Sequence, residues 1–158
     1  MDERYSRLQS VTDDLIGERR PTMPKLVYIA HPLHNGDRIV KDNRTDAWQI
    51  CKAIIRQYPD VMPLSPLQAF GFLAQKDDER AREFCKCLLR LCHEAWFFNS
   101  SPWVEDGVAW RNSPGCMTEY ALAHEWHIPC RDKVFELGRV HLRGVKPRKK
   151  EASDGHDH

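Results

Sequence analysis

Long apolar runs and an excess of charge of one sign are both missing from this sequence of 158 residues. No run of about 18 apolar residues occurs, so we expect no transmembrane helix. The N-terminal segment carries acidic side chains and lacks the apolar stretch of a signal peptide, so we expect a cytoplasmic protein. The 24 lysine and arginine residues nearly balance 23 aspartate and glutamate residues. This balance gives no electrostatic reason to expect a nucleic-acid polymer or a membrane as partner.

The chain has the size and the apolar content of one folded domain, with 41% hydrophobic and 30% charged residues. Six cysteines in a cytoplasmic chain are expected to be reduced rather than paired. We expect residues 1–24 to form a flexible arm, because this segment is polar and ends in Pro21 and Pro24. Residues 145–158 are poor in apolar side chains and predict a disordered tail, which leaves 25–144 as the folded domain.

Short apolar runs alternate with amphipathic stretches along residues 25–144. Apolar runs bounded by loops predict buried strands, and apolar residues three and four apart predict helices. The predicted strands are 26–30, 61–64, 95–98 and a piece that starts at 128–130. The predicted helices are 40–58, 67–73, 78–93 and 115–126, whereas 134–142 fits either a helical turn or a strand.

Two of these helices have a clear apolar face in the sequence. The first predicted buried face contains Ala47, Ile50, Cys51, Ile54 and Ile55, and the second contains Ala81, Phe84, Cys85, Leu88 and Cys92. Strands that alternate with helices predict an α/β fold, doubly wound, with a mainly parallel sheet flanked by helices. Ligands bind such sheets at the carboxyl ends of the strands, which are the loops 31–38, 65–78 and 99–115 here.

The segment around Ser113 has the pattern of a helix start. Ser113 fits the N-cap and Pro114 the first helical position. The backbone N–H groups of Gly115 and Cys116 would then be free to bind an anion, and Glu119 would share their face. The alternative is an ordinary capped helix with a solvated glutamate.

Several segments together resemble one known family. They are Tyr28-Ile29-Ala30-His31-Pro32, then Asn43 and Ala47, then Cys92-His93-Glu94-Ala95-Trp96, then Ser113 to Glu119 with Ala123 and Ile128-Pro129. In this order the sequence resembles the nucleoside 2-deoxyribosyltransferase-like superfamily, within it the small members with a Y-I-A-H-P strand and an S-x-G-x-x-x-E helix start. The resemblance covers about residues 25–131.

The resemblance implies a flavodoxin-like fold and cleavage or exchange of the N-glycosidic bond in a (deoxy)nucleoside or nucleoside 5′-monophosphate. It implies that Glu119 is the nucleophile, that Tyr28 lies beside it, and that Ser113 and Gly115 hold the 5′-phosphate. It implies no cofactor and a homo-oligomer. The apolar character of residues 67–73 makes this stretch a candidate interface or pocket lid.

Further substrate contacts are expected from the Cys116 amide, from His31 after the first strand, and from Asn43 on the first helix. Trp110 lies beside the loop before Ser113, where an indole either stacks on a base or packs in the core.

The sequence departs from the family pattern at the expected second acid. Cys85 falls near the position of the family's aspartate, and His93 replaces the aspartate before Glu94. A thiol is a poor proton donor for a leaving base. A loop acid among Asp77, Asp78, Glu79, Glu105 and Asp106 is one substitute, and a non-catalytic nucleotide-binding protein on the same fold is the alternative function.

Two groups of cysteine and histidine residues do not have metal-binding spacing. Cys85 and Cys87 lie on one predicted helix, and their two-residue separation points the thiols apart. His124 and His127 are one residue short of the i, i+4 spacing that zinc ligation on a helix requires. We therefore expect no metal site.

Overall fold

The computed structural model describes residues 23–33, 40–70, 78–100 and 109–142. The predicted arm, except for residues 23 and 24, and the predicted tail lie outside this range. The elements in chain order are β1 (Lys25–Ala30), α2 (Val40–Gln57), β2 (Val61–Leu64), α3 (Pro66–Phe70), α4 (Asp78–Leu91), β3 (Glu94–Phe98), a 3₁₀ turn (Trp110–Asn112), α5 (Pro114–Glu125), β4 (Cys130–Glu136) and β5 (Arg139–Leu142).

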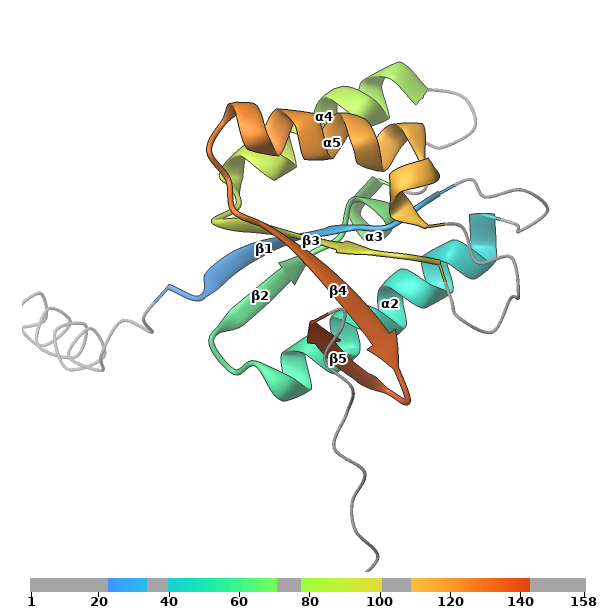
Figure 1. Ribbon diagram of the computed structural model, residues 1–158, viewed down its shortest axis with the longest axis vertical. Helices are drawn as coiled ribbons and strands as arrows, with labels where there is room; N and C mark the ends of the chain where they lie inside the picture. The colour runs from blue at the N-terminus through green and yellow to red at the C-terminus, as the bar shows by residue number, and fades with distance from the viewer. Residues whose placement is uncertain (1–22, 34–39, 71–77, 101–108, 143–158) are drawn as a thin grey trace, which may run out of the picture.

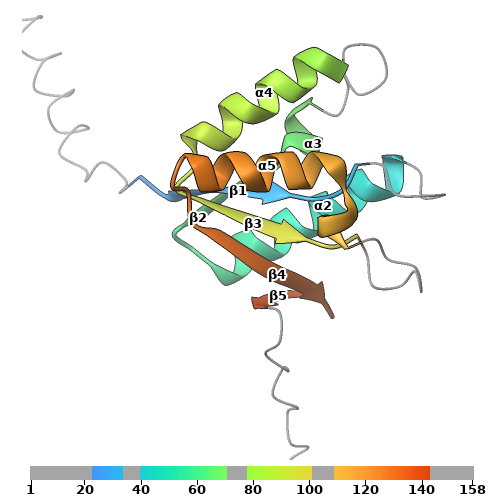
Figure 2. The same ribbon diagram turned by 45° about the horizontal axis from the view of Figure 1, so that its top comes forward.

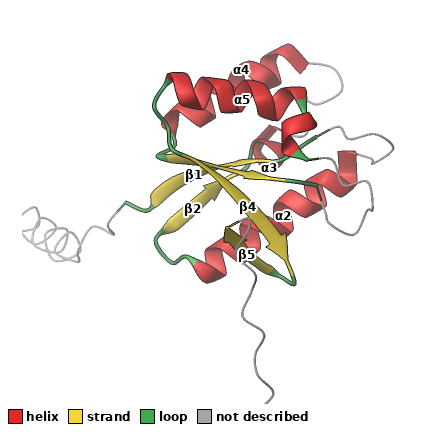
Figure 3. Ribbon diagram, viewed as in Figure 1, coloured by secondary structure: helices red, strands yellow, loops and turns green. Residues whose placement is uncertain are grey.

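The five strands form one sheet in the order β2-β1-β3-β4-β5. The first four strands are parallel, and β5 is antiparallel to β4. Helix α2 covers one face of the sheet, and α4 and α5 cover the other (Figures 1 and 3). The α/β prediction with a mainly parallel sheet is therefore confirmed, and the strand order is compatible with a flavodoxin-like arrangement.

The last two strands form a hairpin, which answers the question that the sequence left open for 134–142. Leu137 and Gly138 both have positive φ, at 51° and 72°, and they join Glu136 directly to its partner Arg139. Consecutive positive φ values match the right-handed twist of the flanking strands. Glycine adopts this conformation without strain, whereas Leu137 is held there at a cost.

The interior strand β1 is buried on both sides over residues 27–30, and its side chains alternate between two cores. Val27 and Ile29 pack with Ile50 and Ile54 of α2. Tyr28 and Ala30 belong to the core under α4 and α5. Successive strand residues point to opposite faces. Because Val27 and Ile29 face α2, the side chain of Tyr28 between them lies on the face that α4 and α5 cover.

The helix predictions hold with local corrections. On α2, Ala47, Ile50 and Ile54 are buried, but Ile55 is 62% exposed and Ala53 is buried instead. The buried face is centred on Ile50 and Ile54, so Ile55 lies beyond its edge.

On α4 the most deeply buried residue is Leu89 rather than Phe84, whose ring packs 5.5 Å from that of Phe70 at the helix surface. Helix α3 ends at Phe70, and residues 71–73 of the predicted short helix lie outside the described range. None of the described helices is both long enough and apolar enough to cross a membrane.

Candidate functional site

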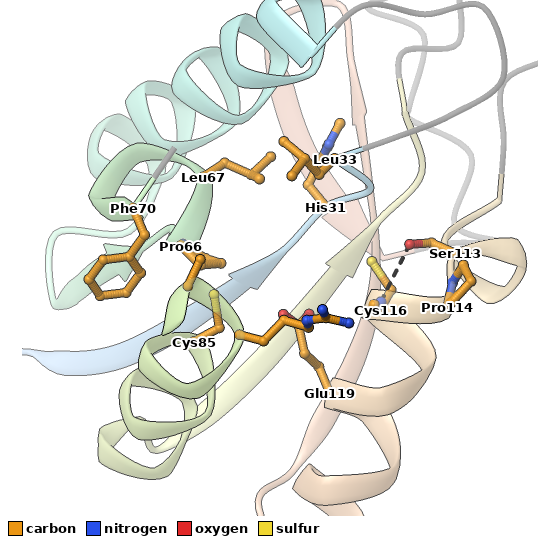
Figure 4. Close-up of a pocket in the computed structure, with 13 residues that line it drawn as sticks. His31, Leu33, Pro66, Leu67, Phe70, Cys85, Ser113, Pro114, Cys116 and Glu119 are labelled. Atoms are coloured by element: carbon orange, nitrogen blue, oxygen red, sulfur yellow. Dashed lines mark hydrogen bonds between the residues drawn. The ribbon is translucent and has the colours of Figure 1, made fainter. Parts of the chain in front are cut away.

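A cavity of about 330 Å³ lies at the carboxyl ends of β1 and β2 (Figure 4). Its lining comes in part from α3, α4 and the start of α5, whose arrangement Figure 2 shows. It lies near the point where the chain order reverses between β1 and β3, which is where parallel α/β sheets bind ligands. The described lining residues are His31, Leu33, Pro66, Leu67, Phe70, Ala81, Arg82, Cys85, Ser113, Pro114, Gly115, Cys116 and Glu119.

Glu119 and Tyr28 form the central contact of the site. The hydroxyl of Tyr28 donates a hydrogen bond of 2.6 Å to Oε1 of Glu119. Tyr28 comes from the interior strand β1 and is fully buried, and Glu119 enters from the second turn of α5. The residues that the resemblance places side by side are thus 91 positions apart in sequence and in direct contact.

The surroundings of this pair shift both acid groups. Desolvation raises the pKa of Glu119 to about 7, although the hydrogen bond from Tyr28 opposes that rise. Burial, and then the charge of Glu119, hold the pKa of Tyr28 well above its usual value of 10.0. Tyr28 therefore stays protonated as a donor, while Glu119 changes its charge near neutral pH.

The predicted cap at the start of α5 is confirmed. Ser113 is the N-cap, and its Oγ accepts a hydrogen bond of 3.4 Å from the backbone N–H of Cys116. The expectation of a free Cys116 amide is therefore wrong, because the cap uses that donor. Ser113, Gly115, Cys116 and Glu119 do line one cavity, as the shared helix face predicts.

His31 lines the cavity, but both of its ring nitrogens face protein. Nδ1 lies 2.8 Å from the carbonyl oxygen of Pro32. A carbonyl only accepts hydrogen bonds, so Nδ1 must carry a proton. Nε2 lies 3.6 Å from Oδ2 of Asp46 on α2. Nε2 is buried and has no hydrogen-bond partner, so the expected contact of His31 with a sugar or phosphate stays a prediction.

Asn43 lies behind the wall of the cavity rather than in it. Its side chain is fully buried, and Nδ2 donates a hydrogen bond of 2.7 Å to the carbonyl oxygen of Leu33. The expected contact of Asn43 with substrate is not found, because Leu33 stands in the lining and Asn43 does not. Asn43 instead holds the segment that forms this wall.

Trp110 packs in the core, the second of the two alternatives that the sequence allowed. Its ring lies 4.6 Å from Phe97 and 5.2 Å from Tyr120, and its Nε1 donates to Asp132 at 3.2 Å. Trp110 is 2% exposed and is absent from the cavity lining, so it does not stack on a base there. Its contacts fix the segment that leads into α5.

The position matched to the family's second acid is in the cavity wall, and it is a thiol, Cys85. His93 lies elsewhere, and its Nδ1 accepts a hydrogen bond from the Leu26 backbone N–H. Glu79 is exposed and is not in the lining; the side chain of Asp78 and residues 77, 105 and 106 are outside the described part. Among the described lining residues, Glu119 is the only carboxylate.

Arg82 and the apolar wall from α3 are site residues that the motif search missed. Arg82 brings a guanidinium to the lining, and Pro66, Leu67 and Phe70 supply apolar surface. A signal for Arg82 was present, because it precedes Cys85 by three residues and so shares its helix face. Residues 67–73 were expected to be an interface or a lid, and the described part of that stretch does contribute cavity wall.

Within the described ranges, no three histidine, cysteine, aspartate or glutamate side chains are grouped to hold a metal ion. Compared with known proteins, the chain matches no family model, no curated protein and no solved structure.

Proposed function

We propose that this protein has a flavodoxin-like fold and cleaves or transfers the N-glycosidic bond of a (deoxy)nucleoside or nucleoside 5′-monophosphate. The observation that carries the proposal is the hydrogen bond between Tyr28 and Glu119 inside a cavity large enough for a small ligand.

The reaction requires a carboxylate beside the sugar. Glycosidic cleavage passes through a state in which C1′ carries positive charge. An ionised Glu119 stabilises that charge or captures C1′ as an ester, and water or a second base then completes hydrolysis or transfer. The hydrogen bond from Tyr28 favours the ionised form and fixes one oxygen, which leaves the other available to C1′.

The start of α5 and Arg82 suit a 5′-phosphate. Ser113 and Gly115 lie in the lining at the positive end of the helix dipole. Arg82 adds a cation to the same cavity. These groups support a phosphate at this end of the substrate, with the sugar over Glu119.

Non-catalytic nucleotide binding is the second candidate, and the chemistry of the lining favours it. Neutral bases need a proton to leave, and the matched position holds the thiol of Cys85 instead of a carboxyl group. A protein with this cavity would then bind a nucleotide without turning it over.

The deciding experiment incubates the purified protein with a panel of nucleosides and nucleoside monophosphates and measures free base by chromatography. We expect base release that is lost in Glu119→Gln. Full base release by this variant would refute the proposed mechanism. Saturable binding without release from any compound favours the binding protein, since a bound ligand still raises the melting temperature.

A cytoplasmic homo-oligomer also belongs to this proposal. The described surface includes two apolar side chains on α4, Phe84 at 37% exposure and Leu91 at 69%. Light scattering at micromolar concentration tests the assembly, and a monomer there would contradict it.

A further inference from the structure

A surface pocket of about 260 Å³ lies between α2 and α3, apart from the cavity that contains Glu119. Its described lining residues are Lys41, Arg44, Thr45, Trp48 and Gln68, and all five are exposed. None of these five residues belongs to the described lining of the cavity. A ligand can therefore reach this surface pocket without any movement of these side chains.

The surface pocket concentrates positive charge in a chain whose net charge is only +1. Arg44 contributes a guanidinium group and Lys41 an ammonium group to the lining. The two carboxylates of α2, Asp42 and Asp46, lie about 100° and about 140° around the helix axis from Lys41. Asp46 points towards His31, at 3.6 Å from its Nε2. The chemistry of the described lining therefore favours a ligand that carries an anionic group.

An aromatic ring lies beside the two cations. Trp48 is 49% exposed, although tryptophan is highly buried on average. The ammonium group of Lys52 lies 4.8 Å from the centroid of the indole ring, and the ring also lines the surface pocket. Along the helix axis, Trp48 is about 6 Å from Arg44 and about 10 Å from Lys41. A flat ring stacked on the indole would therefore be close enough for its phosphate to reach the two cations.

A hydrogen bond between the two helices holds the surface pocket in shape. Nε2 of Gln68 on α3 donates to the backbone carbonyl oxygen of Arg44 on α2, at 2.7 Å. The residue before it, Leu67, lines the cavity instead. The surface pocket is thus formed in the absence of a ligand, and α3 separates it from the cavity.

We propose that this surface pocket is an accessory site for a free nucleotide, with the base against Trp48 and the phosphate on Lys41 and Arg44. Aromatic side chains beside cations bind nucleotides by stacking and by charge, with little dependence on the identity of the base. A volume of about 260 Å³ is near the lower end of the range for small-molecule sites. The site lies outside the cavity lining, so it does not depend on the reaction proposed at Glu119.

The test titrates the protein with adenosine 5′-monophosphate, adenosine and inorganic phosphate, by calorimetry and by tryptophan fluorescence. At this site the nucleotide should bind about 10-fold or more tightly than either adenosine or phosphate, because only the nucleotide makes both contacts. Trp48→Phe keeps a ring, so it should retain binding but lose the change in fluorescence that stacking on Trp48 causes.

Variants distinguish this site from the cavity, which is also proposed to bind nucleotides. Trp48→Ala and Arg44→Gln should each weaken nucleotide binding at the accessory site by about 10-fold, through loss of stacking and of a phosphate contact. The matched control is Arg56→Gln, the same change at an exposed position of α2 outside the described lining, which should bind as the wild-type protein does. Both substituted residues are exposed, so the variants should keep the fold.

Unchanged nucleotide binding in both Trp48→Ala and Arg44→Gln overturns the accessory site, as does adenosine that binds as tightly as its monophosphate. Either result leaves the function proposed for the cavity standing. A short single-stranded oligoadenylate that binds about 100-fold more tightly than the mononucleotide also overturns it, because the pocket would then belong to a nucleic-acid surface. Nucleotide binding that Trp48→Ala weakens, in a protein that releases no base, supports the accessory site and refutes only the reaction at Glu119.

Discussion

The pKa values of two carboxyl groups, one near the amino ends and one near the carboxyl ends of the parallel strands, shift in opposite directions. At the amino edge, Glu94 accepts hydrogen bonds from Lys25 and from Nε1 of Trp96. At the carboxyl edge, Glu119 accepts one from the neutral hydroxyl of Tyr28. Burial raises the pKa of both, but at Glu94 the bonds from Lys25 and Trp96 outweigh it and the net pKa is lowered. The direct partner of Glu94 is therefore a cation and that of Glu119 is a neutral hydroxyl, and this difference separates the two pKa values.

The largest expected effect is on catalysis. Glu119→Gln should lower kcat/KM for base release by about 1000-fold or more, because it removes the carboxylate that we propose meets the charge at C1′. Glu94→Gln, the same change at the other edge, should keep kcat/KM within about threefold once the folded fraction is matched, since it removes no group of the cavity. Equal losses in the two variants would contradict the contrast between the edges.

The second prediction concerns stability against pH. The pKa of Glu119 is raised in the folded state, so its contribution is complete below its unfolded value and is lost as pH rises through about 7. Relative to Glu119→Gln, the wild-type protein should lose up to about 3 kcal/mol of unfolding free energy between pH 4.5 and pH 8. Urea unfolding of both proteins across this pH range measures the difference in their unfolding free energies. A difference that does not change with pH would contradict a desolvated carboxylate at Glu119.

A smaller stability effect of opposite sign is expected at Glu94. Its lowered pKa stabilises the fold above the unfolded value, and this contribution is lost as pH falls. Glu94→Gln should cost about 1–2 kcal/mol at pH 7, because Lys25 loses its charged partner. The difference in unfolding free energy between the wild-type protein and Glu94→Gln should vanish towards pH 3. An unchanged difference at pH 3, measured by urea unfolding, would contradict a stabilising ion pair between Glu94 and Lys25.

The smallest effect is expected from the tyrosine hydroxyl. Tyr28→Phe removes the hydrogen bond that lowers the pKa of Glu119. The pKa of Glu119 should therefore rise, and the rising limb of the pH–rate profile should shift to higher pH. The loss of one hydrogen bond, about 1 kcal/mol, sets the scale of that movement below about one pH unit. Tyr58→Phe on the α2 face is the matched control and should leave the profile in place. A shift of this limb to lower pH in Tyr28→Phe would contradict the proposed effect of the hydrogen bond on the pKa of Glu119.

Much of the fold was predictable because it depends on periodicity. The apolar run at 26–30 and the spacing of Ala47, Ile50 and Ile54 report burial directly. The pairing of Tyr28 with Glu119 came from the family resemblance, since no local pattern links residues so far apart. Segment 134–142 stayed undecided because a hairpin with Leu137 at positive φ has no strong turn signal.

The predictions for the site failed where the sequence identifies a side chain or backbone group but does not identify what that group contacts in the folded protein. The Cys116 amide was expected to be free, and Ser113 bonds to it. Trp110 in a loop gives no sign of whether a base or Phe97 and Tyr120 will cover its ring. Arg82 was overlooked because an arginine on an exposed helix is usually a solvated charge.

The bond from Asn43 to the carbonyl oxygen of Leu33 joins the cavity wall to α2 on the opposite face of the sheet (Figure 1). A ligand that contacts Leu33 would restrict the segment to which Asn43 is bonded. Binding should therefore also stabilise the start of α2, which contributes no residue to the described cavity lining. Slower exchange of the amide protons in the first turns of α2 would then report a filled cavity from the far side of the molecule.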